Sequence, residues 1–392
     1  MREVVIASAV RTAIGGFGGA LSTVPYDELG EIVIKEVLAR AQIRPEKVDE
    51  VIMGNVLQAG LGKNSAGQAA VRAGISQYSP SFTVSKVCGA GMKAVIMAAQ
   101  TIKSGDADII VAGGMENMSA TTFFLPQTAE QPEKGSEEAI ATMIQDGLWC
   151  SFGDTETGIA PDSVGERFGI SREEQDTYAA RSHQRAEAAT TSGRFKDEIV
   201  PVEVAQTAGD PNICATDENP RFGATAETLA KLEPAFAKAG TITAGNSSGV
   251  ADGAAALLLM SAEKAFKMGI KPMAKLIGYD YHWCEPELMG YGPIYAVRSA
   301  LHKVWAKLDK EIDLVELNET FAAQTILSLR ELNLDPEIVN VNGGAIALGH
   351  PMGSSGARIL TTLLFEMQKR DSNVGLAAGM GIACIVEREW HY

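Results

Sequence analysis

The fold is decided by residues 84–100, Val-Ser-Lys-Val-Cys-Gly-Ala-Gly-Met-Lys-Ala-Val-Ile-Met-Ala-Ala-Gln, in which an extended run turns into a helix at Cys88. The helix is apolar on nearly all sides, so we expect it to be buried and to end at Gly105. At the N-terminus of such a helix, unpaired N–H groups and the helix dipole favour a thiolate. The small residues 89–91 leave room for another molecule near the sulfur. These residues predict either a nucleophilic Cys88 or a buried, inert cysteine.

Composition and charge narrow the class of protein. The chain has 392 residues, of which 46% are hydrophobic, and this length allows two or three units with a core of their own. The net charge of −15 argues against nucleic acid or an anionic membrane as a partner. Five cysteines without a Cys-x-x-Cys pair predict neither a disulfide framework nor a metal site, and favour a cytoplasmic protein. We find no signal peptide and expect no membrane span.

The order of strands and helices indicates an α/β fold with an insertion. Apolar strands alternate with helices in the outer parts of the chain, which predicts a mostly parallel sheet covered on both faces. The middle segment has longer loops and more charge, and its clearest helix follows a capping box at Ser171. We expect an N-terminal α/β half at 1–118, completed by about 249–270, a loop domain at 119–248, and a C-terminal α/β half at 271–392.

The second half of the sequence repeats the first. Cys88-Gly89-Ala90-Gly91 corresponds to His350-Pro351-Met352-Gly353, and Ala112-Gly113-Gly114-Met115 corresponds to Ala377-Ala378-Gly379-Met380. If the two copies pack about a pseudo-dyad, the two helix N-termini converge and Cys88 lies opposite His350. A thiolate that faces an imidazole is an arrangement for covalent catalysis. The repeat therefore favours Cys88 as a nucleophile over an inert cysteine.

Other polar residues have two interpretations each. Asn318 lies where a strand ends and a helix begins, so it either caps that helix or directs its amide at a ligand. Residues 281–285 contain one His and one Cys, which make a poor metal site, so we expect a pocket wall or an interface there. His183 and His302 lie on amphipathic helices, and we expect both at the surface.

Five stretches of the sequence resemble the motifs of the thiolase family, closest to its biosynthetic acetoacetyl-CoA type. They are Val87–Gly91, Ala112–Ser119, Thr243–Gly249, Asn318–Phe321 and Gly349–Gly353. The resemblance extends over nearly the whole chain. It implies a five-layered αβαβα fold, a loop domain that holds coenzyme A, and a homodimer or homotetramer. It also implies acyl-CoA and CoA as substrate and product, with no further cofactor.

The resemblance also implies a reaction in two steps. Cys88 takes an acyl group from acyl-CoA, with His350 as its activating base. A second acyl-CoA, deprotonated at its α-carbon, attacks the acyl-Cys; in the simplest case two acetyl-CoA give acetoacetyl-CoA and CoA, reversibly. Asn318 would hold a water that forms an oxyanion hole with His350, supported by Glu319 and Gly379. The positions that match substrate contacts are Arg221, Ala244, Ser248, Met289 and Phe321.

The chain departs from the family at its C-terminal hairpin. The family has a second catalytic cysteine there, in a Cys-x-Gly-Gly-Gly-x-Gly turn, whereas Val374–Gly381 is shorter and has no cysteine. Either the missing residues precede the hairpin, which puts Gly375 at the cysteine position, or they lie within it. Cys384 is the nearest cysteine; we expect it in a strand core, with a relocated acid/base as the alternative.

The missing cysteine leaves three functions open. The first is a complete thiolase. The second is an enzyme that forms acyl-Cys88 but is impaired in the Claisen step, so that it hydrolyses the acyl group or passes it to another acceptor. The third is a subunit that only binds coenzyme A. The presence of Cys88, Asn318 and His350 disfavours the third, because binding alone requires none of them.

Overall fold

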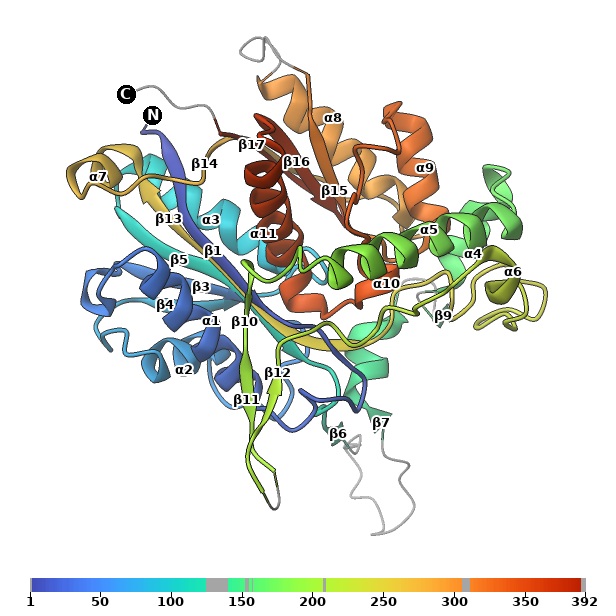
Figure 1. Ribbon diagram of the computed structural model, residues 1–392, viewed down its shortest axis with the longest axis horizontal. Helices are drawn as coiled ribbons and strands as arrows, with labels where there is room; N and C mark the ends of the chain where they lie inside the picture. The colour runs from blue at the N-terminus through green and yellow to red at the C-terminus, as the bar shows by residue number, and fades with distance from the viewer. Residues whose placement is uncertain are drawn as a thin grey trace, which may run out of the picture.

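A large mixed β-sheet forms the centre of the molecule (Figure 1). The computed structural model describes residues 2–124, 140–151, 155–156, 158–206, 209–304 and 311–388. The strands follow the order β15-β16-β17-β14-β1-β13-β5-β3-β4. Their bounds are β1 (Val4–Thr12), β3 (Glu50–Gly54), β4 (Ser81–Val84), β5 (Ile109–Asn117), β13 (Ala251–Ser261), β14 (Ala274–Tyr281), β15 (Leu314–Leu317), β16 (Val374–Gly379) and β17 (Ile382–Glu387). Two short strands, β2 (Gly15–Gly16) and β10 (Ile199–Val200), pair with β13 and β1.

The prediction of a mostly parallel sheet is wrong. The β3–β5, β3–β4 and β15–β16 pairs are parallel, but β13 and β17 run antiparallel to their neighbours. The two halves meet through a short antiparallel contact between β1 and β14. The reason for the error is that β13 is buried along its whole length, as parallel strands usually are, so its sequence shows no alternation.

Helices form three layers around the two halves of the sheet. In the first half, α1 (Tyr26–Arg40) and α2 (Ser65–Arg72) cover the outer face; in the second half, α8 (Gly292–Val304) and α9 (Ala322–Leu332) do so. Between the halves lie α3 (Ala90–Ser104) and α11 (Met352–Arg370), packed against strands of both (Figure 1). The predicted α/β fold with five layers is therefore confirmed. The remaining short helices are η1 (Pro45–Lys47), α7 (Ala262–Lys267), η3 (Pro286–Tyr291) and α10 (Ala345–Leu348).

The N-termini of α3 and α11 meet at the centre of the molecule. A Cβ atom on Gly91 would lie 2.9 Å from the carbonyl oxygen of Gly353, and one on Gly54 would lie 2.6 Å from the Gly91 nitrogen. Only glycine allows backbones to approach this closely. As predicted, α3 is buried and ends at Gly105, which has a φ of +95°. The close contact shows that the two equivalent helices converge.

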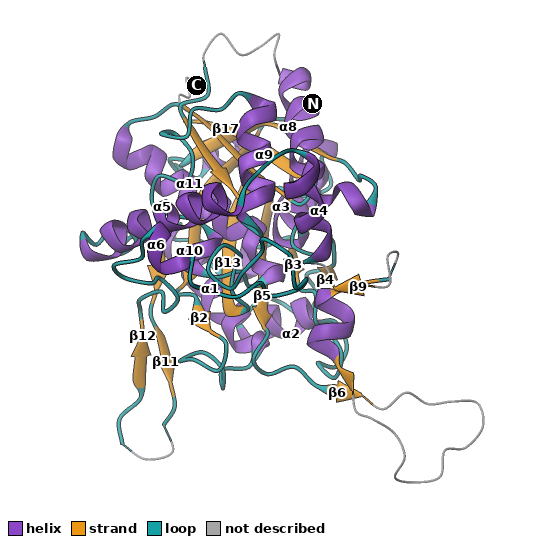
Figure 2. Cartoon of the chain, turned by 90° about the vertical axis from the view of Figure 1, so that its right-hand side faces the viewer, coloured by secondary structure: helices purple, strands orange, loops and turns teal. Residues whose placement is uncertain are grey.

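The chain leaves the sheet between β5 and β13 and returns after a long excursion. Ser171 caps α5 by accepting a hydrogen bond from the Glu174 nitrogen, and Figure 2 shows β11 and β12 extending away from the sheet. A buried ion pair between Arg11 of β1 and Asp217, 2.7 Å long, ties the excursion to the sheet. The elements are β6 (Phe123–Phe124), β7 (Ile140–Ala141), η2 (Met143–Leu148), β8 (Trp149–Cys150), β9 (Thr155–Glu156), α4 (Ile159–Arg167), α5 (Arg172–Thr191), β11 (Val202–Val204), β12 (Asn212–Cys214) and α6 (Ala226–Leu229).

The hairpin of β16 and β17 has a turn of two residues. Met380 and Gly381 have φ values of +40° and +68°, as in the type I′ turns that close tight hairpins. Gly375 lies at the other end of β16, where a Cβ would collide with Met367 and Leu363 of α11. The interpretation that puts Gly375 at the missing cysteine position is therefore wrong. The structure favours the other interpretation, in which the missing residues lie within the hairpin, because its turn has only two residues.

Candidate active site

Cys88 lies in a tight turn immediately before α3. The turn is closed by hydrogen bonds from the Gly89 nitrogen to the Lys86 oxygen and from the Ala90 nitrogen to the Val87 oxygen. Val87 has a φ of +48°, a left-handed conformation that is strained for a β-branched residue. Such strain persists only where the surroundings enforce it, and it is common at functional sites.

The side chains packed around Cys88 are apolar and rich in methionine. Cys88 is 8% exposed and packs with Leu57, Met118 and Met352, and the partly buried Met143 and Met380 border the same cluster. Methionine side chains adapt to irregular shapes. These adaptable side chains can therefore rearrange around a small apolar group attached to the sulfur.

Burial keeps the Cys88 thiol protonated. Burial and, to a smaller extent, the Glu116 carboxylate raise the pKa of the thiol to about 12, against the opposing effects of a backbone hydrogen bond and the Lys86 ammonium. The prediction that the position before a helix favours a thiolate is wrong for the unliganded site, because the loss of hydration outweighs the helix terminus. Cys88 therefore needs a neighbouring base to attack a substrate.

His350 has the properties of that base. Burial and the Arg358 guanidinium lower the pKa of His350 to about 3, so the imidazole is neutral. Its Nδ1 lies 2.7 Å from the Ser355 hydroxyl, which lies 2.9 Å from the Pro351 carbonyl oxygen. Since that carbonyl only accepts, Ser355 donates to it and His350 Nδ1 donates to Ser355. Nε2 then has a free lone pair, and it has no hydrogen-bond partner among the described residues.

Glu116 of β5 links the N-terminus of α11 to the segment that follows β3 in the first half, and the sequence did not predict this role. Its carboxylate accepts hydrogen bonds from the nitrogens of Val56 (3.0 Å) and Leu57 (3.1 Å) in the first half and from the nitrogen of Gly353 (2.8 Å) in α11. Burial raises its pKa to about 7. Met352, two residues after His350, packs against Cys88. The structure thus places Cys88 and His350 at adjoining helix ends, as the repeat predicted.

Asn318 is not a helix cap. Helix α9 begins at Ala322, and its N-cap is Phe321. The Asn318 side chain donates to the Thr320 hydroxyl at 3.1 Å, and its buried Oδ1 has no hydrogen-bond partner among the described residues. A Cβ on Gly379 would lie 2.6 Å from the Asn318 Cβ. Of the two interpretations, the structure favours an amide directed at a ligand, with Gly379 supporting it from the hairpin.

Glu319 supports the site from behind. Its carboxylate accepts hydrogen bonds from the Tyr178 hydroxyl (2.8 Å) and the Ser182 hydroxyl (2.7 Å) of α5 and from the Asn340 amide (2.7 Å). Because α5 belongs to the excursion, this carboxylate fixes the excursion against the second half of the sheet.

The predicted substrate contacts form two groups. The Arg221 guanidinium donates to the Ala244 oxygen at 3.1 Å. Ser248 donates to the Thr320 oxygen from both its nitrogen (3.0 Å) and its hydroxyl (3.1 Å), next to the buried Phe321. The side chain of the fifth residue, Met289, lies outside the described part of the chain; its backbone belongs to η3.

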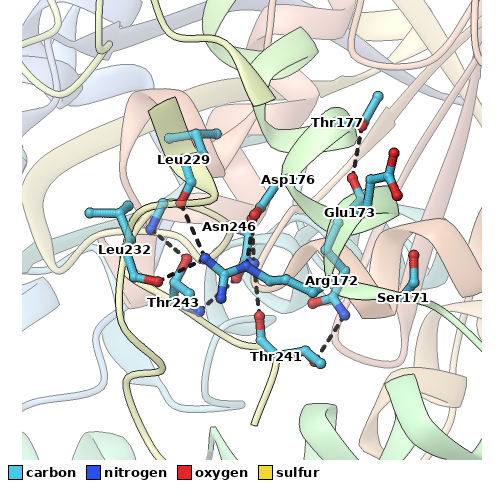
Figure 3. A network of polar contacts seen from close by, with 12 residues as sticks. Ser171, Arg172, Glu173, Asp176, Thr177, Leu229, Leu232, Thr241, Thr243 and Asn246 are labelled. Carbon is cyan, nitrogen blue, oxygen red and sulfur yellow. Dashed lines mark hydrogen bonds and ion pairs between the residues drawn. The ribbon is translucent and has the colours of Figure 1, made fainter. Parts of the chain in front are cut away.

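A polar network holds the segment that contains Ala244 and Ser248 (Figure 3). Arg172 pairs with Asp176 at 2.7 Å and donates to the oxygens of Leu229 and Leu232. Asp176 accepts from the Asn246 amide at 2.9 Å, and Asn246 accepts from the Thr243 nitrogen at 2.8 Å. Helix α5 therefore sets the position of residues 243–249.

His183 lies next to Arg221 and is buried, so the prediction of a surface position is wrong. It is 1% exposed, and its Nδ1 accepts a hydrogen bond from the Arg221 nitrogen at 3.1 Å. Burial lowers the pKa of His183 to about 4. Helix α5 is covered on one face by residues far away in the sequence, which its own pattern does not reveal. His302 is exposed on α8, as predicted.

Cys384 lies in the core, as its sequence context predicts. It is fully buried in β17, between Ala377 and Tyr279 of the neighbouring strands, and burial raises its pKa to about 12. This position gives no support to the alternative of a relocated acid/base. Among the described residues, no cluster of three His, Cys, Asp or Glu side chains could hold a metal ion.

Comparison with known proteins identifies relatives of the whole chain. Residues 4–263 match the family described as "Thiolase, N-terminal domain", and residues 270–388 match "Thiolase, C-terminal domain". An acetyl-CoA acetyltransferase of Cupriavidus necator is 49% identical, over 99% of this chain and all of that protein. One of Syntrophomonas wolfei is 51% identical, over 98% and 99%. The crystal structure of the Bacillus anthracis acetyl-CoA acetyltransferase has a TM-score of 0.95 at 40% identity, over 99% of both chains.

Proposed function

Because the chain belongs to the thiolase family, we propose that it condenses two acetyl-CoA molecules to acetoacetyl-CoA and CoA, reversibly, through an acyl group on Cys88. Relatives about half identical over their full length are named acetyl-CoA acetyltransferases. The observation that supports the chemistry best is the neutral His350. Its Nε2 has no hydrogen-bond partner within the described part of the chain, and the residue lies just before α11, whose N-terminus adjoins that of α3.

The first step transfers an acetyl group to the enzyme. His350 Nε2 takes the proton of the Cys88 thiol, and the sulfur attacks the thioester carbonyl of acetyl-CoA. The bond between the carbonyl carbon and the CoA sulfur breaks, and the departing CoA thiolate takes the proton back from His350. In this proposal Asn318, whose Oδ1 has no hydrogen-bond partner among the described residues, holds a water that stabilises the oxyanion.

The second step has a weaker basis in this chain. It requires a base for the α-proton of the second acetyl-CoA, and the tight turn at Met380 and Gly381 has no ionisable side chain. This observation favours a second candidate function, in which acyl-Cys88 forms but Claisen condensation is slow, so that water or another acceptor takes the acyl group. Loss of a general base costs about 10²–10⁴-fold in rate.

Coenzyme A is bound, in this proposal, by residues 119–248 as the loop domain, and it is substrate and product rather than a cofactor. Arg221 is exposed and can contact a phosphate of the nucleotide, while Ala244, Ser248 and Phe321 line the pantetheine arm. In the described part of the chain no helix is long and apolar enough to span a membrane. We further propose a homodimer or homotetramer in the cytoplasm.

Intact mass after mixing with acetyl-CoA tests the proposal, with Cys88→Ala as the control. The wild type should gain one acetyl group, lose it again on addition of CoA, and both form and cleave acetoacetyl-CoA; the variant should do none of these. A stable adduct without acetoacetyl-CoA turnover would establish the second candidate instead. Release of CoA from acetyl-CoA without an adduct or acetoacetyl-CoA would also indicate the second candidate, through hydrolysis, whereas no adduct, no CoA release and no turnover would contradict both.

A further inference from the structure

Lys86 joins the turn that contains Cys88 to the tip of the shortened hairpin. It stands two residues before Cys88, and its ammonium donates a hydrogen bond to the Met380 carbonyl oxygen at 3.1 Å. Its side-chain Cδ would lie 3.6 Å from a Cβ on Gly89, and Ile382 of β17 packs on the same spot. The lysine side chain thus lies along the turn that contains Cys88 and contacts the hairpin at Met380.

The hairpin tip is fixed from the opposite side as well. The His282 nitrogen donates to the Gly381 oxygen at 2.8 Å, and a Cβ on Gly292 would lie 3.0 Å from the Gly381 nitrogen and 3.7 Å from the Cys284 sulfur. The Lys86 ammonium also lies 5.1 Å from the centre of the Trp283 ring, a favourable cation–aromatic contact. Lys86 therefore connects the hairpin tip and Trp283 to the turn that contains Cys88.

The charge of Lys86 acts on the two thiols nearby. Burial and the Lys93 ammonium of α3 lower the pKa of Lys86, whereas a thiolate at Cys88 or Cys284 would raise it. Cys88 in turn experiences Lys86 and, with the opposite effect, Glu116 of β5. The neutral His350 adds no charge. Lys86 is therefore the cation that opposes the cost of forming a thiolate at Cys88.

We propose that Lys86 is a positioning residue for acyl transfer: it holds Met380 against the apolar cluster around Cys88 and places a positive charge near the Cys88 sulfur. The inference rests on the proposed role of Cys88 as the nucleophile. A fixed nearby cation increases the fraction of thiolate, which is the reacting species, and this matters most for a buried thiol that seldom ionises. A hairpin with a turn of only two residues also offers few other groups to hold its tip in place.

Substitutions at Lys86 separate its two effects. Lys86→Met removes both the charge and the hydrogen bond, Lys86→Gln retains a donor for the Met380 oxygen without the charge, and Lys86→Arg retains both. Lys93→Met is the matched control, because Lys93 is a nearby lysine, in the first turn of α3, that also lies over an aromatic ring, 3.7 Å from the centre of Tyr281. For each protein, intact mass gives the rate of Cys88 alkylation by iodoacetamide as a function of pH, and the rate of acetylation by acetyl-CoA.

Lys86→Met and Lys86→Gln should shift the alkylation profile upward by about one pH unit, which slows acetylation about tenfold at neutral pH. Lys86→Arg and Lys93→Met should resemble the wild type, and only Lys86→Met should also raise the KM for acetyl-CoA. A wild-type profile in Lys86→Gln, or an equal shift in Lys93→Met, would overturn the proposal. Failure of the wild type to become acetylated would instead refute the proposed function, and the alkylation profiles would still test the charge.

Discussion

The two halves of the molecule differ most at the corner where a central strand turns back along the sheet. In the first half, β5 ends at Asn117 and β13 begins at Ala251, so the whole excursion that contains Arg221 and Ser248 fits between them. In the second half, the equivalent strands β16 and β17 are joined by two residues. The same corner therefore occurs once in each half. It contains a large insertion in the first half and a turn of two residues in the second.

This comparison indicates a division of roles. The first corner places the proposed binding residues on elements outside the sheet, which hydrogen bonds and ion pairs around Arg172 and Glu319 then fix. The second corner has no room for such elements, and its backbone itself contacts the site through Gly379 and Met380. Changes at the second corner should therefore affect turnover, and changes in the excursion should affect binding or stability.

The largest effect is expected for Gly379→Ala. The new Cβ would lie 2.6 Å from the Asn318 Cβ, so Asn318 or the hairpin must move. A displacement of this size in a catalytic group lowers kcat about a hundredfold, and overpacking costs about 1–3 kcal/mol of stability. Steady-state kinetics and urea unfolding measure the two effects.

Gly375→Ala is the matched control on the same strand. Its Cβ would collide with Met367 and Leu363 in the core, far along β16 from the turn. This variant should lose about 1–3 kcal/mol of stability, as Gly379→Ala does, and should retain the wild-type kcat. Equal losses of kcat in both variants would show that activity follows stability, and the proposed division of roles would be wrong.

Ser355→Ala should have the next largest effect. Without the hydroxyl at 2.7 Å, Nδ1 of His350 loses its acceptor, and the tautomer that has a free Nε2 is no longer fixed. We expect kcat to fall about tenfold with little change in KM. Ser354→Ala removes the neighbouring hydroxyl, which also bonds to Pro351, without touching His350. If Ser354→Ala lowers kcat as much, the effect belongs to the helix end and not to the imidazole.

Much of the fold follows from short-range sequence features. The glycine-rich repeats predicted the two converging helices, because only glycine permits their contact at Gly91 and Gly353. The apolar pattern predicted α3 together with its end at Gly105. Strand direction was not predictable in this way, since β13 is equally apolar whether its neighbours run parallel or antiparallel.

The candidate site was predictable in its residues but not in its electrostatics. Cys88, His350 and Asn318 stand at element boundaries that the sequence marks. The pKa of Cys88 depends on how deeply Leu57, Met118 and Met352 enclose it, which only the tertiary structure shows. Glu116 was missed for the same reason: its partners at Val56, Leu57 and Gly353 come from distant segments.

The smallest expected effect concerns His183 of the excursion and the pH dependence of the protein's stability. Its pKa is about 4 in the folded protein against about 6.5 for an exposed histidine, so the unfolded chain binds more protons between these values. The stability contributed by the neutral His183 is therefore fully present above pH 6.5 or so and is lost as the pH falls toward 4. Between pH 7 and 5 the loss from this residue amounts to about 2 kcal/mol.

His183→Gln removes this loss, while its amide oxygen can still accept from the Arg221 nitrogen. Urea unfolding at pH 7 and pH 5 should show a drop in stability smaller by about 2 kcal/mol than in the wild type, with kcat unchanged at pH 7. His302→Gln, on the exposed face of α8, should retain the wild-type drop. A fall in kcat for His183→Gln would mean that the excursion also sets the geometry of the reacting groups, and the two corners would then share both roles.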